Sequence, residues 1–218
     1  MNLYIYPIWM LLIAFTPVVQ GQAPASFGLK AGVSVANQSW KFTNLDFTLD
    51  TEPVTGVAAA FFVEAFKGEH FSFQLDLAYL DKGSKTTTES ITVNHADDDR
   101  IEVNEGDEFT SKFTYISVST LARYRFDLEH LVPYFLLGPR LDFLLNYETE
   151  SAYPLKTQNG TILGLTLGTG LEYRLNQFHL FAEIQYQSDL IPVTNKDPLL
   201  INNNILSFTI GFRRIVSF

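Results

Sequence analysis

Alternation between apolar residues and small or polar residues dominates the chain after residue 21, and it constrains the fold more than any other feature. From Leu163 to Leu175 the odd positions hold leucine, threonine or tyrosine, whereas the even positions hold glycine, threonine, glutamate or arginine. A period of two is typical of β-strands whose two faces meet different surroundings. The pattern recurs and predicts eight strands: residues 26–37, 56–66, 71–83, 113–126, 132–146, 162–175, 177–188 and 204–214.

The connections between these segments alternate in length. Short connections are expected at residues 67–70, 127–131 and around 176, and long ones at 38–55, 84–112, 147–161 and 189–203. Short turns on one rim and long loops on the other are typical of barrels in the outer membrane of Gram-negative bacteria. The prediction is therefore an all-β fold, an eight-stranded antiparallel up-and-down transmembrane β-barrel.

Side-chain volume decides which face of the strands is predicted to point outward. One face carries large apolar side chains such as Phe61, Leu77 and Phe143, and an eight-stranded barrel has too little interior space for so many of them. The opposite face is small or charged, as expected of a lumen. A soluble exported barrel with its apolar face inward around a hydrophobic ligand is the alternative.

The N-terminus has the composition of a secretory signal. Residues 3–19 are apolar, and small residues precede a cleavage point expected near Gly21, although no Lys or Arg precedes the apolar stretch. We expect residues 1–21 to be a cleaved signal peptide and residues 22–218 to form the barrel domain. A short membrane anchor or a buried helix is the alternative for this segment.

Composition excludes several other classes of protein. The formal net charge of −9 argues against general nucleic-acid binding, which requires a basic surface. The chain contains no cysteine, so it has no disulfide, thiolate metal site or thiol nucleophile.

The inward-facing positions are predicted to hold six positive and five negative side chains. Unpaired charges are costly in a narrow interior, so we expect an ion-pair network that plugs the lumen. A proton or small-ion path along this network is the functional alternative. The predicted network consists of Lys30, Glu64, Asp76, Arg123, Arg125, Arg140, Asp142, Glu172, Arg174, Glu183 and Arg213.

Several strands together resemble the PorT-like outer-membrane β-barrel family. Residues 73–85 (FQLDLAYLDKGSK) are similar to its third strand, residues 27–37 (FGLKAGVSVAN) to its first, and residues 133–145 (PYFLLGPRLDFLL) to its Pro-Tyr…Gly-Pro strand. The similarity continues in residues 164–175 and 206–213, so it spans almost the whole mature chain. It implies a barrel in the outer membrane, and the family's namesake belongs to a protein-secretion apparatus.

The segment from Thr86 to Ser111 contains eight carboxylates and one arginine, and therefore accounts for −7 of the net charge. Clustered carboxylates suit Ca²⁺, but the EF-hand spacing is absent. The expected structure is a solvated acidic loop in which residues 91–93 and 101–103 extend the hairpin above the membrane. The candidate metal ligands would be Asp97, Asp98, Asp99, Glu105 and Asp107.

No catalytic motif accompanies the histidines. His95 lies near the acidic run and could activate a water, but no nucleophile, zinc or phosphate-binding signature is present. We therefore expect a non-enzymatic protein without cofactors, with a structural, adhesion or secretion-accessory role through its long loops. The expected partners are outer-membrane lipid and lipopolysaccharide, the barrel-assembly machinery, and a secretion-apparatus or cell-surface protein. A narrow conduit for ions or small molecules is the main alternative.

Overall fold

Every element in the described part of the chain is a β-strand. The computed structural model describes residues 25–42, 47–66, 68–87, 90–93, 101–104, 108–149, 160–191 and 199–216. None of these residues belongs to a helix long and apolar enough to cross a membrane. The strands are β1 (Ser26–Phe42), β2 (Phe47–Asp50), β3 (Glu52–Ala65), β4 (Phe71–Thr87), β5 (Ser90–Val93), β6 (Ile101–Asn104), β7 (Glu108–Arg125), β8 (Leu131–Thr149), β9 (Thr161–Leu175), β10 (Phe178–Asp189) and β11 (Leu199–Ile215).

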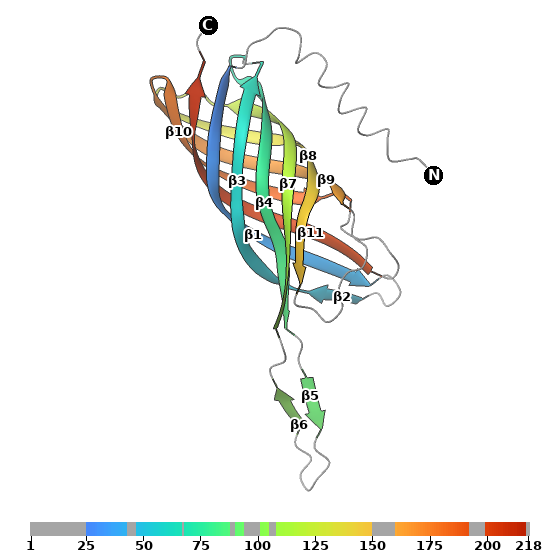
Figure 1. The fold of residues 1–218 in the computed structure, drawn as a ribbon. Coiled ribbons are helices and arrows are strands. Elements are labelled where there is room, and N and C mark those ends of the chain that lie inside the picture. Colours follow the sequence, from blue (N-terminus) through green and yellow to red (C-terminus); the bar gives the residue numbers. More distant parts are fainter. Residues whose placement is uncertain are drawn as a thin grey trace, which may run out of the picture.

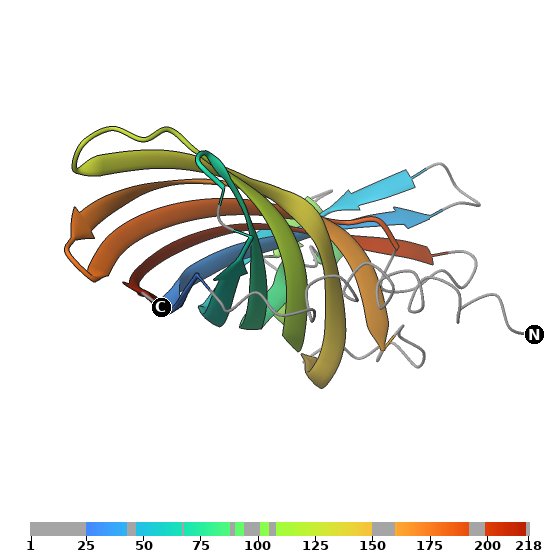
Figure 2. The same ribbon diagram turned by 90° about the horizontal axis from the view of Figure 1, so that it is seen from above.

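Eight of these strands form a closed antiparallel barrel. The sheet order is β1, β3, β4, β7, β8, β9, β10, β11, so each strand pairs with the next one along the sheet. β11 then pairs with β1 from Ser26↔Ile215 to Phe42↔Leu199, which closes the sheet on itself. Figures 1 and 2 show the first strand (blue) and the last (dark red) side by side. The predicted eight-stranded up-and-down topology is confirmed.

The two ends of the barrel differ. Short connections at residues 66–70, 126–130 and 176–177 join strands at one end, which we call the short-turn end. The other end, called the loop end, carries the long connections and the separate β5–β6 hairpin (Figure 1). At the tightest turn Asn176 has a φ of 49°, a left-handed conformation that asparagine tolerates better than most residues.

The strands extend further at the loop end than the sequence predicts. The β4–β7 ladder continues to Thr87↔Glu108, and β5 and β6 pair separately beyond it. The neighbouring strand β3 stops pairing with β4 at Lys85, and β8 stops pairing with β7 at Ser111. Much of the predicted 84–112 loop is therefore strand. The expected extension of the hairpin at residues 91–93 and 101–103 is observed as β5 and β6, whereas the extensions of β4 and β7 were not predicted, because most of their residues are polar and give little hydrophobic signal.

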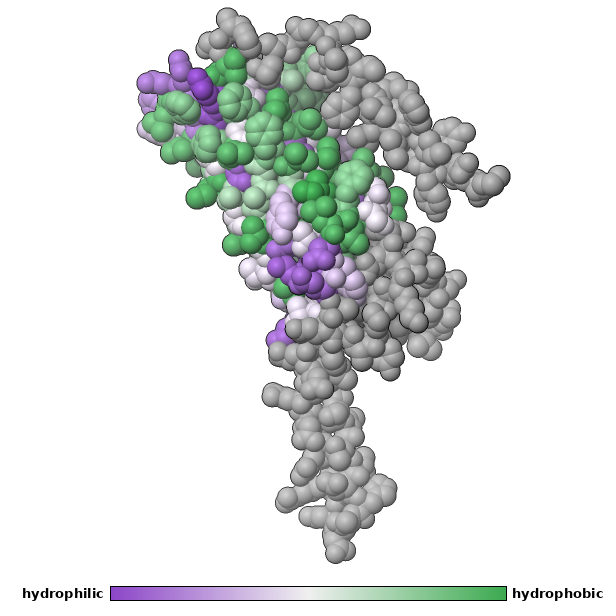
Figure 3. Space-filling model, viewed as in Figure 1, coloured by the Kyte–Doolittle hydropathy of each residue, from purple (hydrophilic) through white to green (hydrophobic). Residues whose placement is uncertain are grey.

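The outer wall is apolar, as predicted from side-chain volume. Phe61, Leu77, Phe143 and Leu167 are all exposed on it. Figure 3 shows hydrophobic side chains over the wall nearer the short-turn end and hydrophilic ones below them. A belt of this kind is suited to lipid, and the alternative of a soluble barrel with an inward apolar face is wrong.

The lumen is less uniformly small and charged than predicted. Buried Phe62, Leu121, Tyr134, Leu136 and Phe181 form an apolar cluster inside it, and Phe113, Tyr115, Ile162 and Ile201 form another.

Inward-facing glycines make room for these rings. A Cβ at Gly170 would lie 2.3 Å from Cζ of Tyr134, and one at Gly28 would lie 2.5 Å from Cζ of Phe62. The sequence predicts these glycines only as small lumen residues, whereas Gly28 and Gly170 each leave space for a ring on the adjacent strand.

Candidate functional site in the barrel lumen

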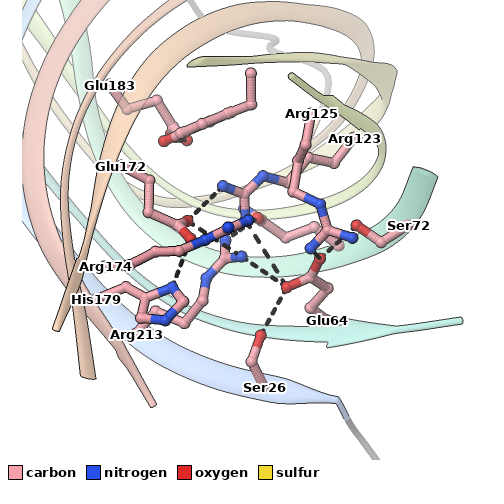
Figure 4. Close-up of polar contacts among 12 residues, drawn as sticks. Ser26, Glu64, Ser72, Arg123, Arg125, Glu172, Arg174, His179, Glu183 and Arg213 are labelled. Carbon is pink, nitrogen blue, oxygen red and sulfur yellow. Dashed lines mark hydrogen bonds and ion pairs between the residues drawn. The ribbon is translucent and has the colours of Figure 1, made fainter. Parts of the chain in front are cut away.

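Three arginines converge on two glutamates at the short-turn end of the lumen (Figure 4). The Nη1 atom of Arg213 lies 2.7 Å from Oε2 of Glu64, and Nη1 of Arg125 lies 3.2 Å from its Oε1. The Nη2 atom of Arg123 lies 2.5 Å from Oε2 of Glu172. All five side chains are buried, and they come from β3, β7, β9 and β11. This short-turn cluster therefore ties four strands together.

Hydroxyl and imidazole groups complete the carboxylates of this cluster. Ser26 donates to Oε2 of Glu64 over 2.7 Å, and Ser72 donates to its other oxygen. Nδ1 of His179 lies 2.6 Å from Oε1 of Glu172. Each oxygen of both buried carboxylates is within hydrogen-bond distance of a partner, as burial of a charge requires.

A second group of charges lies further along the lumen. Nζ of Lys30 lies 2.6 Å from Oδ2 of Asp76 and 2.7 Å from Oε1 of Glu183, and the hydroxyl of Tyr134 donates to the other oxygen of Glu183. Gln74 joins this middle cluster to the first one, because its amide donates to Asp76 and its oxygen accepts from Arg213.

A ladder of glutamines on β10 carries the hydrogen bonds toward the loop end. Gln185 donates to Glu183 over 2.9 Å, Gln187 donates to Gln185 over 3.0 Å, and Arg140 donates to Gln187 over 2.7 Å. These inward positions lie two residues apart on one strand, so their side chains follow one another along the lumen.

Arg140 organises the third, loop-end cluster. Its Nε atom donates to Asp142 over 2.9 Å and its Nη2 atom donates to Asp189 over 2.5 Å. Lys82 lies 2.5 Å from Asp142 and 3.3 Å from Asp189. Asn203 donates to the second oxygen of Asp189. Hydrogen bonds therefore run through the lumen from the short-turn end to the loop end.

We call the linked polar side chains of the three clusters and the glutamine ladder the column. Charge is balanced in both halves of this column. In the short-turn and middle clusters four cations face four anions, and in the loop-end cluster two cations face two anions, so each half sums to zero. Balance avoids the large free-energy cost of an uncompensated buried charge. The cations are Arg123, Arg125, Arg213 and Lys30, then Lys82 and Arg140; the anions are Glu64, Glu172, Asp76 and Glu183, then Asp142 and Asp189.

The guanidinium of Arg123 is also held by an aromatic ring. Its Cζ atom lies 3.9 Å from the ring centroid of Tyr134, a cation–π distance. The ring covers one face of a guanidinium whose Nε and Nη1 atoms donate no hydrogen bond to the described residues.

A small gap interrupts the filling of the lumen beside the glutamine ladder. Its volume is about 20 Å³, enough for one water molecule. Ser119, Ser207 and Thr209 line it together with alanines and Lys30. We call this space the lumen gap.

Ten of the eleven side chains predicted to form the lumen network are buried there, and Arg174 is the exception. Arg174 lies at the short-turn rim, where its side chain is 35% exposed and pairs with Asp127. It is the last inward-facing residue before the turn, and alternation specifies the face of a residue but not its depth.

Lys82 and Asp189 were missed by the sequence reasoning. Both fall at predicted strand ends, where inward and loop positions cannot be distinguished from the pattern. Charge arithmetic gave no signal for them, because one cation and one anion leave the balance unchanged; the predicted excess of one cation corresponds to Arg174, which lies at the rim. The contact between His179 and Glu172 was not predicted either.

The predicted metal candidates Asp97, Asp98, Asp99, Glu105 and Asp107 lie outside the described residues, as does His95. Within the described ranges, no group of three or more histidine or carboxylate side chains is arranged to hold a metal ion.

Residues 20–195 match the family model described as outer membrane protein beta-barrel domain. The chain belongs to this family. Membership agrees with the closed barrel and its apolar outer wall, and it locates the protein in the outer membrane, surrounded by lipid.

Three solved structures similar to this outer-membrane barrel are distant in sequence. Ail, the attachment invasion locus protein of Yersinia pestis, is 14% identical, with 88% of this chain and 99% of that one covered and a TM-score of 0.40. OprG from Pseudomonas aeruginosa is 12% identical, with 92% and 100% covered and a TM-score of 0.48. Neisserial surface protein A is 14% identical, with 90% and 100% covered and a TM-score of 0.47. No curated protein matches the chain in sequence.

Proposed function

We propose that this outer-membrane barrel is a non-enzymatic protein that acts through its long loops, in a structural, adhesion or secretion-accessory role. The observation that carries the proposal is the filled lumen. Charged, amide and aromatic side chains follow one another along it, and the lumen gap has room for only about one water. A barrel whose described residues fill the lumen acts on its surroundings through its rims and its outer wall.

The loop end supports this role by its length and charge. The β4–β7 ladder extends past the last pairs that its neighbours make, and residues 86–111 carry eight carboxylates against one arginine. A projecting, strongly acidic hairpin attracts cationic partners and repels anionic ones. A secretion-apparatus or cell-surface protein is the kind of partner that we propose.

We also propose that the chain belongs to the PorT-like branch and that the barrel-assembly machinery inserts it. Residues 73–85 and 133–145 support the assignment through their similarity to that branch's strand patterns. The secretion role of the namesake remains part of the proposal.

The test removes the projecting hairpin while keeping the barrel. Residues 88–107 are replaced by Asn-Gly, a two-residue turn suited to close the pair Thr87↔Glu108. Outer membranes containing either protein are cross-linked, and the proteins captured with each are compared by mass spectrometry. Loss of a specific cross-linked protein from the variant is expected. An identical set of cross-linked proteins would contradict a role for this hairpin.

A narrow conduit is the second candidate, and the hydrogen-bonded network that runs through the lumen from end to end is the observation that favours it. Planar bilayers distinguish the two functions. We expect no discrete conductance from the wild-type protein, whereas a conduit would conduct, and Arg140→Ala or Glu172→Ala would change its conductance.

A further inference from the structure

The outer wall is hollowed around Ile210. Its neighbours across the ladder are Ala31 on β1 and Ala182 on β10, and Ala31 is followed by Ala59 on β3. Three small side chains in one row leave Ile210 standing as a ridge that is 72% exposed. Two hollows of about 1030 Å³ and about 610 Å³ share this ridge, and both are also lined by Ala31 and Ala182.

The surroundings of the hollows are hydrocarbon-like. Leu29, Leu180 and Phe212 line the larger one, and Ile184 and Phe208 line the smaller. All five side chains are exposed on the outer wall. Because the protein lies in the outer membrane, acyl chains surround this wall.

A cation lies below the ridge on the same strand and the same face. Arg214 is exposed and follows Ile210 by four residues, which places it about 13 Å along β11 at the usual strand rise of ~3.3 Å per residue. It lies next to the short-turn end, one residue before the end of β11. Its guanidinium is 5.8 Å from the ring centroid of Phe178, and no carboxylate of the described residues forms an ion pair with it.

This spacing matches a lipid with a phosphate headgroup and two chains. The larger hollow lies between Ile210 and Arg214 and the smaller one continues beyond Ile210, so together they suit acyl chains that run along β11 from this rim, and an arginine at the membrane boundary suits a phosphate. We propose that the outer wall along β11 is a binding site for one phospholipid of the leaflet at the short-turn end. Its acyl chains run along the two hollows past Ile210 and its phosphate contacts Arg214.

A second copy of the chain fits the same surface less well. A two-fold interface centred on β11 uses the same patch of both copies, so it would bring the two Arg214 side chains close together. Like charges at short range in a membrane are unfavourable, whereas a phosphate neutralises Arg214. The inference is independent of what the loops bind.

The test counts bound lipid on the intact mature protein. The protein is purified in detergent, dimyristoyl phosphatidylglycerol is added, and native mass spectrometry measures the bound molecules over a range of lipid concentrations. The wild-type protein is expected to hold one lipid more tightly than all others. Arg214→Gln is expected to weaken the affinity for that lipid about fivefold, equivalent to ~1 kcal/mol. The double variant Ala31→Leu, Ala182→Leu is expected to abolish preferential binding of the lipid.

Two controls match these changes. Ala122→Leu makes one such substitution at another outward position of the wall, on β7, and Lys112→Gln removes an outward cation, paired with Asp81, near the loop end. Neither residue lines the hollows. Both controls are expected to bind lipid as the wild type does, and a heat-dependent gel shift verifies that each variant is folded.

Three results would overturn the inference. One is equal lipid binding by the filled double variant and the wild type. Another is equal weakening by the Ala122→Leu or Lys112→Gln control. The third is a wild-type protein that is dimeric and a double variant that is monomeric, because a second copy would then occupy the hollows.

Discussion

Arg140 donates hydrogen bonds to Asp142, Gln187 and Asp189 from a fully buried position. It illustrates what single residues contribute to this barrel: each buried charge is held by partners from other strands. Removing one partner leaves the others without compensation in a medium that solvates them poorly.

Arg140→Ala should therefore destabilise the barrel by about 3–5 kcal/mol, because Lys82 alone would face Asp142 and Asp189. Urea unfolding in lipid vesicles, followed by the heat-dependent gel shift, measures the change. Arg174→Ala is the matched control: its ion pair with Asp127 is one-third exposed, so its loss should cost at most ~1 kcal/mol. Equal effects of the two variants would show that burial of the column does not matter.

Gly170→Ala tests the space that a glycine leaves for a ring. The added Cβ would lie 2.3 Å from Cζ of Tyr134, so the ring must move away from Glu183 and Arg123. We expect a loss of about 1–3 kcal/mol in the same unfolding measurement. At Gly160 a Cβ meets nothing within 4 Å, and Gly160→Ala should leave stability unchanged. If Gly170→Ala left the free energy of unfolding unchanged, Tyr134 would have another position available in the lumen.

At the scale of elements, the barrel is closed by strand pairs that do not depend on the projecting hairpin. β4 and β7 are held to each other and to their neighbours β3 and β8 along the barrel wall, whereas β5 and β6 pair only with each other. A two-stranded ribbon contributes little stability by itself.

Replacing residues 88–107 by Asn-Gly should therefore leave barrel stability within ~0.5 kcal/mol of the wild type. The urea midpoint in vesicles measures this, and the full-length protein is the reference. A large loss of stability, or failure to show the heat-dependent shift, would mean that the hairpin takes part in forming the barrel.

At the scale of the whole molecule, the apolar belt determines where the barrel resides. Leu167 lies near the middle of β9 and is 53% exposed on the outer wall. In water a charge at such a position would be harmless, but in the hydrocarbon core it is expensive.

Leu167→Arg should destabilise the protein in vesicles by about 2–4 kcal/mol, because the arginine must be accommodated near the bilayer midplane. Leu145→Arg, toward the loop end of β8, should cost only about 0–1 kcal/mol, because exposed arginines near the boundary reach water. Equal costs at both positions would contradict the depth that we assign to the belt.

Particular residues show which features of the structure the sequence predicts and which it does not. Alternation with a period of two is a local property, so it predicted the strands, the outward face of Phe61 and Leu77, and the inward face of Lys30 and Arg140. Together with side-chain volume it also predicted the outer membrane, and the resemblance of segments such as residues 73–85 and 133–145 implied an outer-membrane barrel family. It left out the loop-end extensions of β4 and β7, because most of their residues are polar.

The sequence by itself therefore determined the class of fold, the two faces of the wall and the membrane in which the wall is stable, since these follow from local periodicity and side-chain volume. Only the tertiary structure decided which charges meet. Glu64 and Arg213 are 149 residues apart, and they come together because barrel closure and strand register place β3 and β11 at the same depth. The hollow around Ile210 has the same origin, because its three alanines lie on strands that only the closed barrel sets in one row.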